Sequence, residues 1–229
     1  IRLVRNEKNE GLTPSLNKGI VHSRAKYIAR LDADDIALPT RLGKQVEFME
    51  ANSNVGLCGT FAEIFGAETG ILKSPEADGE ISVDFCFFNC FVHSSVMIRR
   101  SILDQYKLAY RLPFCEDYDL WCQISRVSQV YNIPEILVRY RKHAQQMTNV
   151  HLSKYVEFKD EVIGTYLNTL FEDVIDLVVL QFIHTTIVHP EEEPEYAKIL
   201  DAVKKLNHYN DKHRVRDGVV FLKGLKKKI

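Results

Sequence analysis

The segment Tyr27-Ile28-Ala29-Arg30-Leu31-Asp32-Ala33-Asp34-Asp35 decides the fold class, because in it an apolar run ends in a cluster of carboxylates. The apolar part is typical of a short strand, and open α/β sheets bind ligands at strand ends. Crowded carboxylates repel one another unless a hard cation such as Mg²⁺ or Mn²⁺ lies among them. The segment therefore predicts a strand that ends at a metal site. The alternative is a solvated acidic turn that caps the helix beginning near Pro39.

Strands and helices alternate on both sides of this segment. The expected order is a strand at 1–5, a helix with Thr13 as its N-cap, the strand at 27–31, a helix opened by Pro39, and strands at 55–59, 93–98 and 136–141. The helix after Pro39 is expected to bury Leu42, Val46 and Met49 on one face. This alternation predicts an α/β fold with a partly parallel sheet over residues 1–150. Helical periodicity then predicts a helical C-terminal region at 151–229.

The composition, 45% hydrophobic and 27% charged over 229 residues, is that of an ordinary globular protein. Lys+Arg 30 against Asp+Glu 31 argues against nucleic-acid binding through bulk charge. No apolar run reaches the roughly 18 residues that would span a bilayer. The five cysteines lack the spacing of a zinc site, and we expect them to be buried and reduced.

Two later segments also carry residues suited to chemistry. Glu116 and Asp117, with Asp119, precede the apolar pair Leu120-Trp121, and an acid beside such a face could act as a general base. The alternative is that these acids cap a helix. The cations of 139–142 could hold phosphates and His143 could ligate a metal, whereas the alternative is a solvated strand edge.

Taken together and in order, these segments resemble the family 2 glycosyltransferases, which have the GT-A fold. The matching phrases are NEGLTPSLNKGI at 9–20, YIARLDADD at 27–35, PTRL at 39–42 with Gln45, VGLCG at 55–59, HSSVM at 93–97, EDYDLW at 116–121, and YRKH at 140–143 with Gln146 and Thr148. Each phrase is weak alone, but the ordered series is specific, and it covers about residues 1–150. The resemblance implies a metal-dependent enzyme that transfers a sugar, with inversion, from a nucleotide-diphosphate donor to an acceptor hydroxyl. It also implies a place in the synthesis of surface polysaccharide or another glycan.

On the donor side, the resemblance gives Asp34 of the DxD motif a role in binding Mn²⁺ or Mg²⁺, which His143 completes. It places Asp32 and Asp35 beside the donor. The other residues that it assigns to the donor are Arg30, His93 and Arg141.

On the acceptor side, the resemblance makes Asp117 the base that takes the proton of the acceptor hydroxyl. Glu116 frames the acceptor or orients that base. Asp119 and Trp121 are assigned to the acceptor itself.

The sequence departs from the family pattern at its start. Family members open with two strand–helix units that meet the nucleotide base, and here residues 1–4 align with the third strand. Three explanations stay open: part of a full enzyme, a natural non-catalytic remnant that binds a sugar or a partner, or a site completed by another chain. A metal-dependent phosphatase is a further alternative.

A sheet without those units has an open edge, so we expect a homodimer or strand exchange to cover it. The expected partners are a nucleotide-sugar donor and a glycan or lipid-linked acceptor. The expected location is the cytoplasm, with peripheral contact at the inner face of a membrane.

Overall fold

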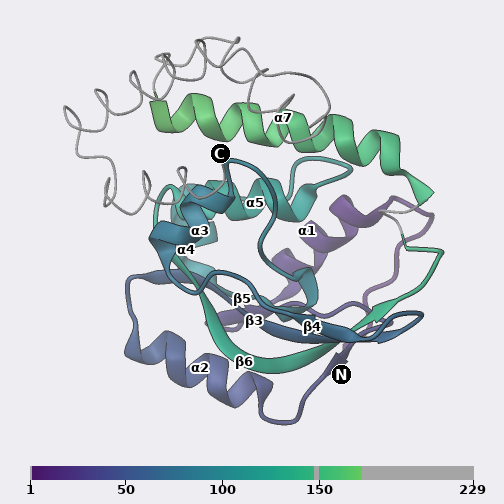
Figure 1. Ribbon diagram of the computed structural model, residues 1–229, viewed down its shortest axis with the longest axis horizontal. Helices are drawn as coiled ribbons and strands as arrows, with labels where there is room; N and C mark the ends of the chain where they lie inside the picture. Colours follow the sequence, from purple (N-terminus) through teal and green to yellow (C-terminus); the bar gives the residue numbers. More distant parts are fainter. Residues whose placement is uncertain (1, 147–149, 172–229) are drawn as a thin grey trace.

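The computed structural model describes residues 2–146 and 150–171, and in them a curled mixed sheet lies between helices (Figure 1). The strands are β1 (Tyr27–Ala29), β2 (Ile36–Ala37), β3 (Val55–Gly66), β4 (Gly70–Leu72), β5 (Met97–Arg99) and β6 (Gln129–Lys142). Their order is β1-β5-β3-β6-β2, with β4 paired to β3. The long strands β3 and β6 run parallel, whereas the other pairs are antiparallel. The predicted partly parallel α/β sheet is confirmed.

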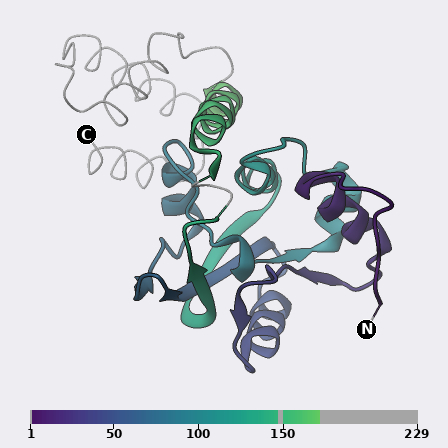
Figure 2. The ribbon, with the colours of Figure 1, turned by 90° about the vertical axis from the view of Figure 1, so that its right-hand side faces the viewer.

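Helices cover both faces of this sheet. They are α1 (Leu12–His22), α2 (Arg41–Ala51), α3 (Asp78–Asp84), the 3-10 helix η1 (His93–Ser95), α4 (Arg100–Tyr106), α5 (Glu116–Ser125) and α7 (Leu152–Phe171). Among the described helices, α2 lies alone on one face, and α1, α5 and α7 lie on the other (Figures 1 and 2). The core divides in the same way, with a small apolar cluster around Met49 under α2 and a large one around Trp121 under α5.

Helix α7 packs into the larger cluster, because Val162, Tyr166 and Leu167 are buried there together with residues of α5. Most of the predicted C-terminal region, residues 172–229, lies outside the described residues, so the boundary at 150 stays a prediction. No helix in the part of the chain that the structure describes is long and apolar enough to span a bilayer. All five cysteines are buried, as expected, and none forms a disulfide bond.

The prediction for the first residues of the chain is wrong. Residues 2–5 form no strand and are exposed. Helix α1 begins at Leu12 after Gly11, which serves as the N-cap with a φ of 86° that favours glycine. Thr13 is therefore not the cap; it lies inside the first turn, where its hydroxyl donates to the carbonyl of Leu112 at 2.6 Å.

The predicted buried face of α2 is correct only at Met49. Leu42 is 54% exposed and Val46 is 37% exposed, whereas Arg41 and Gln45 are buried. Arg41 donates to the carbonyls of Arg30 and Val96 at 2.8 and 3.0 Å, and Gln45 donates to that of Ser95 at 2.8 Å. Polar side chains take the buried face because these strand-end carbonyls need donors away from water.

The strand that we expected at 93–98 is shorter than predicted. Residues 93–95 form η1, and β5 begins only at Met97. The amide of Asp32 donates to the hydroxyl of Ser94 at 3.0 Å, so this turn of 3-10 helix contacts the acid-rich segment directly.

Gly59 of β3 permits a close approach that any side chain would block. A Cβ at this position would lie 2.5 Å from Cδ1 of Phe91 and would also clash with Oδ1 of Asn132. We expect Gly59→Ala to lower the free energy of unfolding by about 1–3 kcal/mol or more, because a packed core resists an added methyl group. Gly43→Ala is the matched control, since nothing lies within 4 Å of a Cβ there and alanine favours a helix interior. Urea unfolding of both variants tests the prediction, and equal stabilities would contradict it.

Candidate active site

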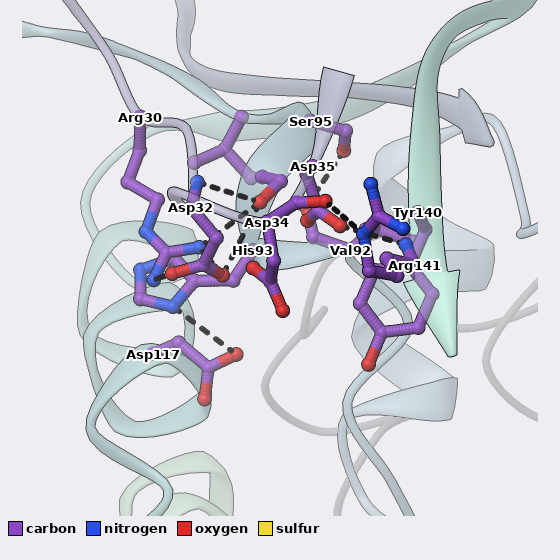
Figure 3. Close-up of polar contacts among 12 residues, drawn as sticks. Arg30, Asp32, Asp34, Asp35, Val92, His93, Ser95, Asp117, Tyr140 and Arg141 are labelled. Atoms are coloured by element: carbon purple, nitrogen blue, oxygen red, sulfur yellow. Dashed lines mark hydrogen bonds and ion pairs between the residues drawn. The ribbon is translucent and has the colours of Figure 1, made fainter. Parts of the chain in front are cut away.

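Asp32, Asp34 and Asp35 lie in the turn between β1 and β2, with their carboxylates turned toward a common space (Figure 3). One oxygen from each lies within 4.8 Å of the others. β2 pairs with β6 in the register Ile36↔Arg139, and this pairing brings the end of β6 against the turn. The acid triplet, as we call these three residues, therefore meets the basic end of β6.

Asp35 is the most buried member of the acid triplet. Its Oδ1 accepts the amide N–H of Arg141 at 2.8 Å, and its buried Oδ2 accepts no hydrogen bond from the described residues. Burial raises the pKa of Asp35, and the neighbouring charges of Asp34 and Asp32 raise it further, while the Ser94 hydroxyl and the Arg141 amide oppose the shift. A buried carboxylate oxygen without a partner fits a divalent cation, which would supply the missing charge.

Asp34 and His143, the two predicted metal ligands, are brought together by the fold. The His143 Nε2 atom lies 3.0 Å from Oδ2 of Asp34. Arg141 holds the same turn, because its Nε donates to the carbonyl of Asp34 at 2.9 Å. The Arg141 guanidinium also lies over the ring of Phe65, 4.4 Å from its centroid, which limits its motion.

Asp32 has a cationic partner already. The guanidinium of Arg30 donates through two nitrogens to both oxygens of Asp32, and the Ser94 hydroxyl donates to its Oδ2 at 3.2 Å. The Arg30 side chain is only 9% exposed. A bidentate pair of this kind leaves Asp34, Asp35 and His143 as the better candidates for ligands to a metal.

Glu116 and Asp117, which we call the acid pair, form a second acidic group in the first turn of α5. Their side chains are 11% and 19% exposed, and the Nδ1 atom of His93 lies 4.0 Å from each carboxylate. The guanidinium of Arg30, which binds Asp32 (Figure 3), also acts through its charge on both acids of this pair. Burial raises the pKa of Asp117, and Arg30 opposes that shift.

His93, in η1, lies beside the acid pair. Burial, and then the positive charge of Arg30, lower the pKa of His93 well below its usual value, so the ring is neutral at pH 7. Its Nε2 lies 3.0 Å from the hydroxyl of Tyr110, and Trp121 packs edge-on against the ring at 5.6 Å between centroids. The ring is therefore fixed from two sides.

Burial and the neighbouring Asp117 raise the pKa of Glu116 to about 7. Above that pH Glu116 is ionised in both states, buried in the folded protein and solvated in the unfolded chain. Its buried charge therefore carries a free-energy penalty that destabilises the folded protein. As the pH falls from 7 toward the ordinary value of 4.5, the folded protein takes up the proton first and this penalty disappears.

We therefore expect Glu116→Gln to raise the free energy of unfolding by roughly 2–3 kcal/mol at pH 8 and by under about 1 kcal/mol at pH 5. Urea unfolding at the two pH values measures the difference. The same gain at both would contradict the assigned cause.

Two residues that we assigned to the acceptor lie away from the surface. Asp119 is 4% exposed and accepts two hydrogen bonds from Arg111 and one from Gln123. Trp121 is 0% exposed, and its ring packs against His93. In this structure both residues support α5 and its acidic first turn, and a contact with an acceptor stays a prediction.

One residue of the site went unnoticed in the sequence. The Nδ2 atom of Asn89 donates to Oδ2 of Asp117 at 2.8 Å. Asn89 stands in the aromatic run 85–91, whose pattern indicates only a core, and nothing local connects it with an acid 28 residues later.

Comparison with known proteins agrees with this geometry. Residues 1–107 match the family model for glycosyl transferase family 2. An uncharacterized glycosyltransferase of Haemophilus influenzae is 34% identical over 191 residues, which is 76% of this chain and 59% of that protein. The amylovoran biosynthesis glycosyltransferase AmsE of Erwinia amylovora is 32% identical over 139 residues, 59% of this chain and 52% of that protein. The chain thus spans little more than half the length of these two relatives.

Among solved structures, the crystal structure of S. aureus TarS 1-349 in complex with UDP-GlcNAc has a TM-score of 0.56 and 11% sequence identity. The match covers 87% of this chain and 61% of that one. At this identity the likeness concerns the fold, and it agrees with the curled mixed sheet and its flanking helices. Residues 1–107 thus belong to glycosyl transferase family 2, and the described part of the chain has the GT-A fold.

Proposed function

We propose that the protein transfers a sugar from a nucleotide-diphosphate donor to an acceptor hydroxyl, with inversion at the anomeric carbon. The observation that carries the proposal is the pairing of two acidic groups within one site. One group is the acid triplet with a histidine beside it, the other is a carboxylate pair, and the charge of Arg30 acts on both.

The donor side is the acid triplet with the end of β6. Asp34, Asp35 and His143 would hold Mn²⁺ or Mg²⁺, which when bound offsets the charge of the departing diphosphate. Arg141 would contact the diphosphate, since its side chain lies at the edge of the acid triplet. Arg30 and His93 would line the donor sugar, between the acid triplet and the acid pair.

The acceptor side is the acid pair. The acceptor oxygen attacks the anomeric carbon while the bond from that carbon to the diphosphate oxygen breaks, and Asp117 takes the hydroxyl proton. Attack and departure on opposite faces invert the configuration. Glu116 would orient Asp117, because the two carboxylates share one buried place.

The similarity to AmsE, which is named as an amylovoran biosynthesis glycosyltransferase, supports a role in polysaccharide synthesis. We propose a glycan or lipid-linked acceptor, and a location in the cytoplasm at the inner face of a membrane. A homodimer that covers the edge at β1 stays a prediction.

The test incubates the protein with Mn²⁺ and a panel of UDP- and GDP-sugars, with and without oligosaccharide acceptors. The expected result is release of nucleoside diphosphate and a product whose anomeric configuration, read by NMR, is opposite to that of the donor. Phosphate release from a simple ester without reaction of any nucleotide-sugar would favour the phosphatase instead. Binding of oligosaccharide without any nucleotide would favour the non-catalytic remnant.

A further inference from the structure

Asn89, in the loop between α3 and η1, makes two hydrogen bonds that fix the orientation of its side chain. Its Oδ1 accepts the amide N–H of Phe91 at 3.1 Å, and its Nδ2 donates to Oδ2 of Asp117 at 2.8 Å. A flipped amide would turn its oxygen to the carboxylate and its NH₂ group to the N–H, so only one orientation satisfies both partners. The contact with Asp117 is therefore a charge-assisted hydrogen bond from a defined atom.

The loop that carries Asn89 is anchored in the core. Cys90 and Phe91 are 6% and 5% exposed, and the Phe91 ring packs against Phe85 and Trp121. The close approach of Phe91 to Gly59 fixes the same loop against β3. The position of the Asn89 amide is thus set by buried packing, and it does not depend on the surface.

Burial opposes the negative charge of Asp117, so the few groups around it that favour this charge carry weight. Glu116 on α5 repels it, His93 on η1 is neutral, and Arg30 beyond β1 attracts it. Tyr110, Cys115, Cys122 and Tyr155 also interact with Asp117, and burial raises the pKa of each, which keeps them neutral. Direct donors to the carboxylate are the Tyr118 amide, at 2.7 Å from Oδ1, and the Asn89 amide.

We propose that Asn89 is a positioning residue for Asp117: its amide fixes the orientation of the carboxylate and stabilises the ionised form that takes the acceptor proton. A hydrogen bond to the charged form of an acid favours that form. The catalytic consequence rests on the proposed function. The effect on the protonation of Asp117 needs no substrate and can be measured alone.

Two variants separate the donor from the packing. Asn89→Asp keeps the shape and the oxygen that accepts the Phe91 amide, but it replaces the donor with a second carboxylate. Asn89→Ala removes the donor without adding a charge, and it supplies the comparison if the aspartate variant does not fold. Asn54→Asp is the matched control, because it makes the same chemical change at an exposed position beside β3.

The readout is the titration of the Asp117 carboxyl carbon by NMR in protein carrying ¹³C-labelled aspartate, with the resonance identified by its loss in Asp117→Asn. We expect its midpoint to rise by about one pH unit or more in Asn89→Asp, to rise by less in Asn89→Ala, and to stay unchanged in Asn54→Asp. In transfer assays, the acid limb of kcat/KM should move to higher pH by the same amounts, while the KM for the donor stays the same.

An unmoved midpoint in folded Asn89→Asp and Asn89→Ala would overturn the proposal, and so would a loss of kcat that is equal at every pH. If the wild type transfers no sugar, the proposed function fails, and if Asp117→Asn keeps full transfer, the role of Asp117 as the base fails, whatever the titration of Asp117 shows. If Asp117→Asn is inactive and the Asn89 variants leave the titration unmoved, only the role of Asn89 fails.

Discussion

Replacing Asp117 with Asn is expected to lower the rate of sugar transfer by a factor of about 10²–10⁴, because the amide cannot take the proton of the acceptor hydroxyl. The variant should remain folded. Asn has the same shape, and its amide oxygen can still accept one of the two hydrogen bonds that now come from Asn89 and the Tyr118 amide. Rates of product formation at saturating donor, with Mn²⁺ present, measure the loss.

The matched control for this variant is Asp104→Asn. Asp104 lies on the exposed side of α4, where it pairs with Arg100 at 3.4 Å, and its substitution should leave transfer unchanged. Transfer at the wild-type rate by Asp117→Asn would remove Asp117 from the mechanism. If circular dichroism shows that the inactive Asp117→Asn is also unfolded, the less disruptive Asn89 variants test the role of Asp117 instead.

Replacing Asp34 with Asn is expected to weaken Mn²⁺ binding by about 10–100-fold or more and to reduce transfer at least as much. Asp34 offers its carboxylate beside His143 and the buried Asp35, and an amide oxygen carries no charge to balance the ion. Titration of Mn²⁺ followed by electron paramagnetic resonance measures the affinity without any substrate.

Glu68→Gln is the control for Asp34→Asn, since it removes the same charge from the exposed turn between β3 and β4. It should bind Mn²⁺ as the wild type does. Unchanged Mn²⁺ affinity in Asp34→Asn would show that the acid triplet is a solvated turn, the alternative that the sequence also allowed.

The parts of the site that could be predicted from the sequence are those with a local signature. The acids at 32–35 come three residues after the end of a strand, and Glu116 and Asp117 open a helix, so the pattern around each indicates its place. The meeting of Asp34 with His143 could also be expected, but only from the resemblance to a family, because the pairing of β2 with β6 joins segments about a hundred residues apart.

The rest depends on tertiary contacts that have no local pattern. Arg41 reads as a surface residue before the apolar Leu42, yet the fold buries it because carbonyls at the strand ends need its donors. Trp121 follows the acids of α5 by one turn, but it points into the core rather than to the acceptor side. Asn89 contacts Asp117 only because Phe91 anchors its loop against Gly59.

The central claim is that the acid triplet holds the donor and its metal ion while Asp117 acts on the acceptor. Calorimetric titration of UDP and GDP in the presence of Mn²⁺, carried out on the wild type, Asp117→Asn and Asp34→Asn, tests this division most directly. The account predicts that Asp117→Asn binds the nucleotide with wild-type affinity although it transfers sugar far more slowly, and that Asp34→Asn has much weaker Mn²⁺-dependent binding. Equal nucleotide binding in all three proteins, or its loss in Asp117→Asn alone, would contradict it.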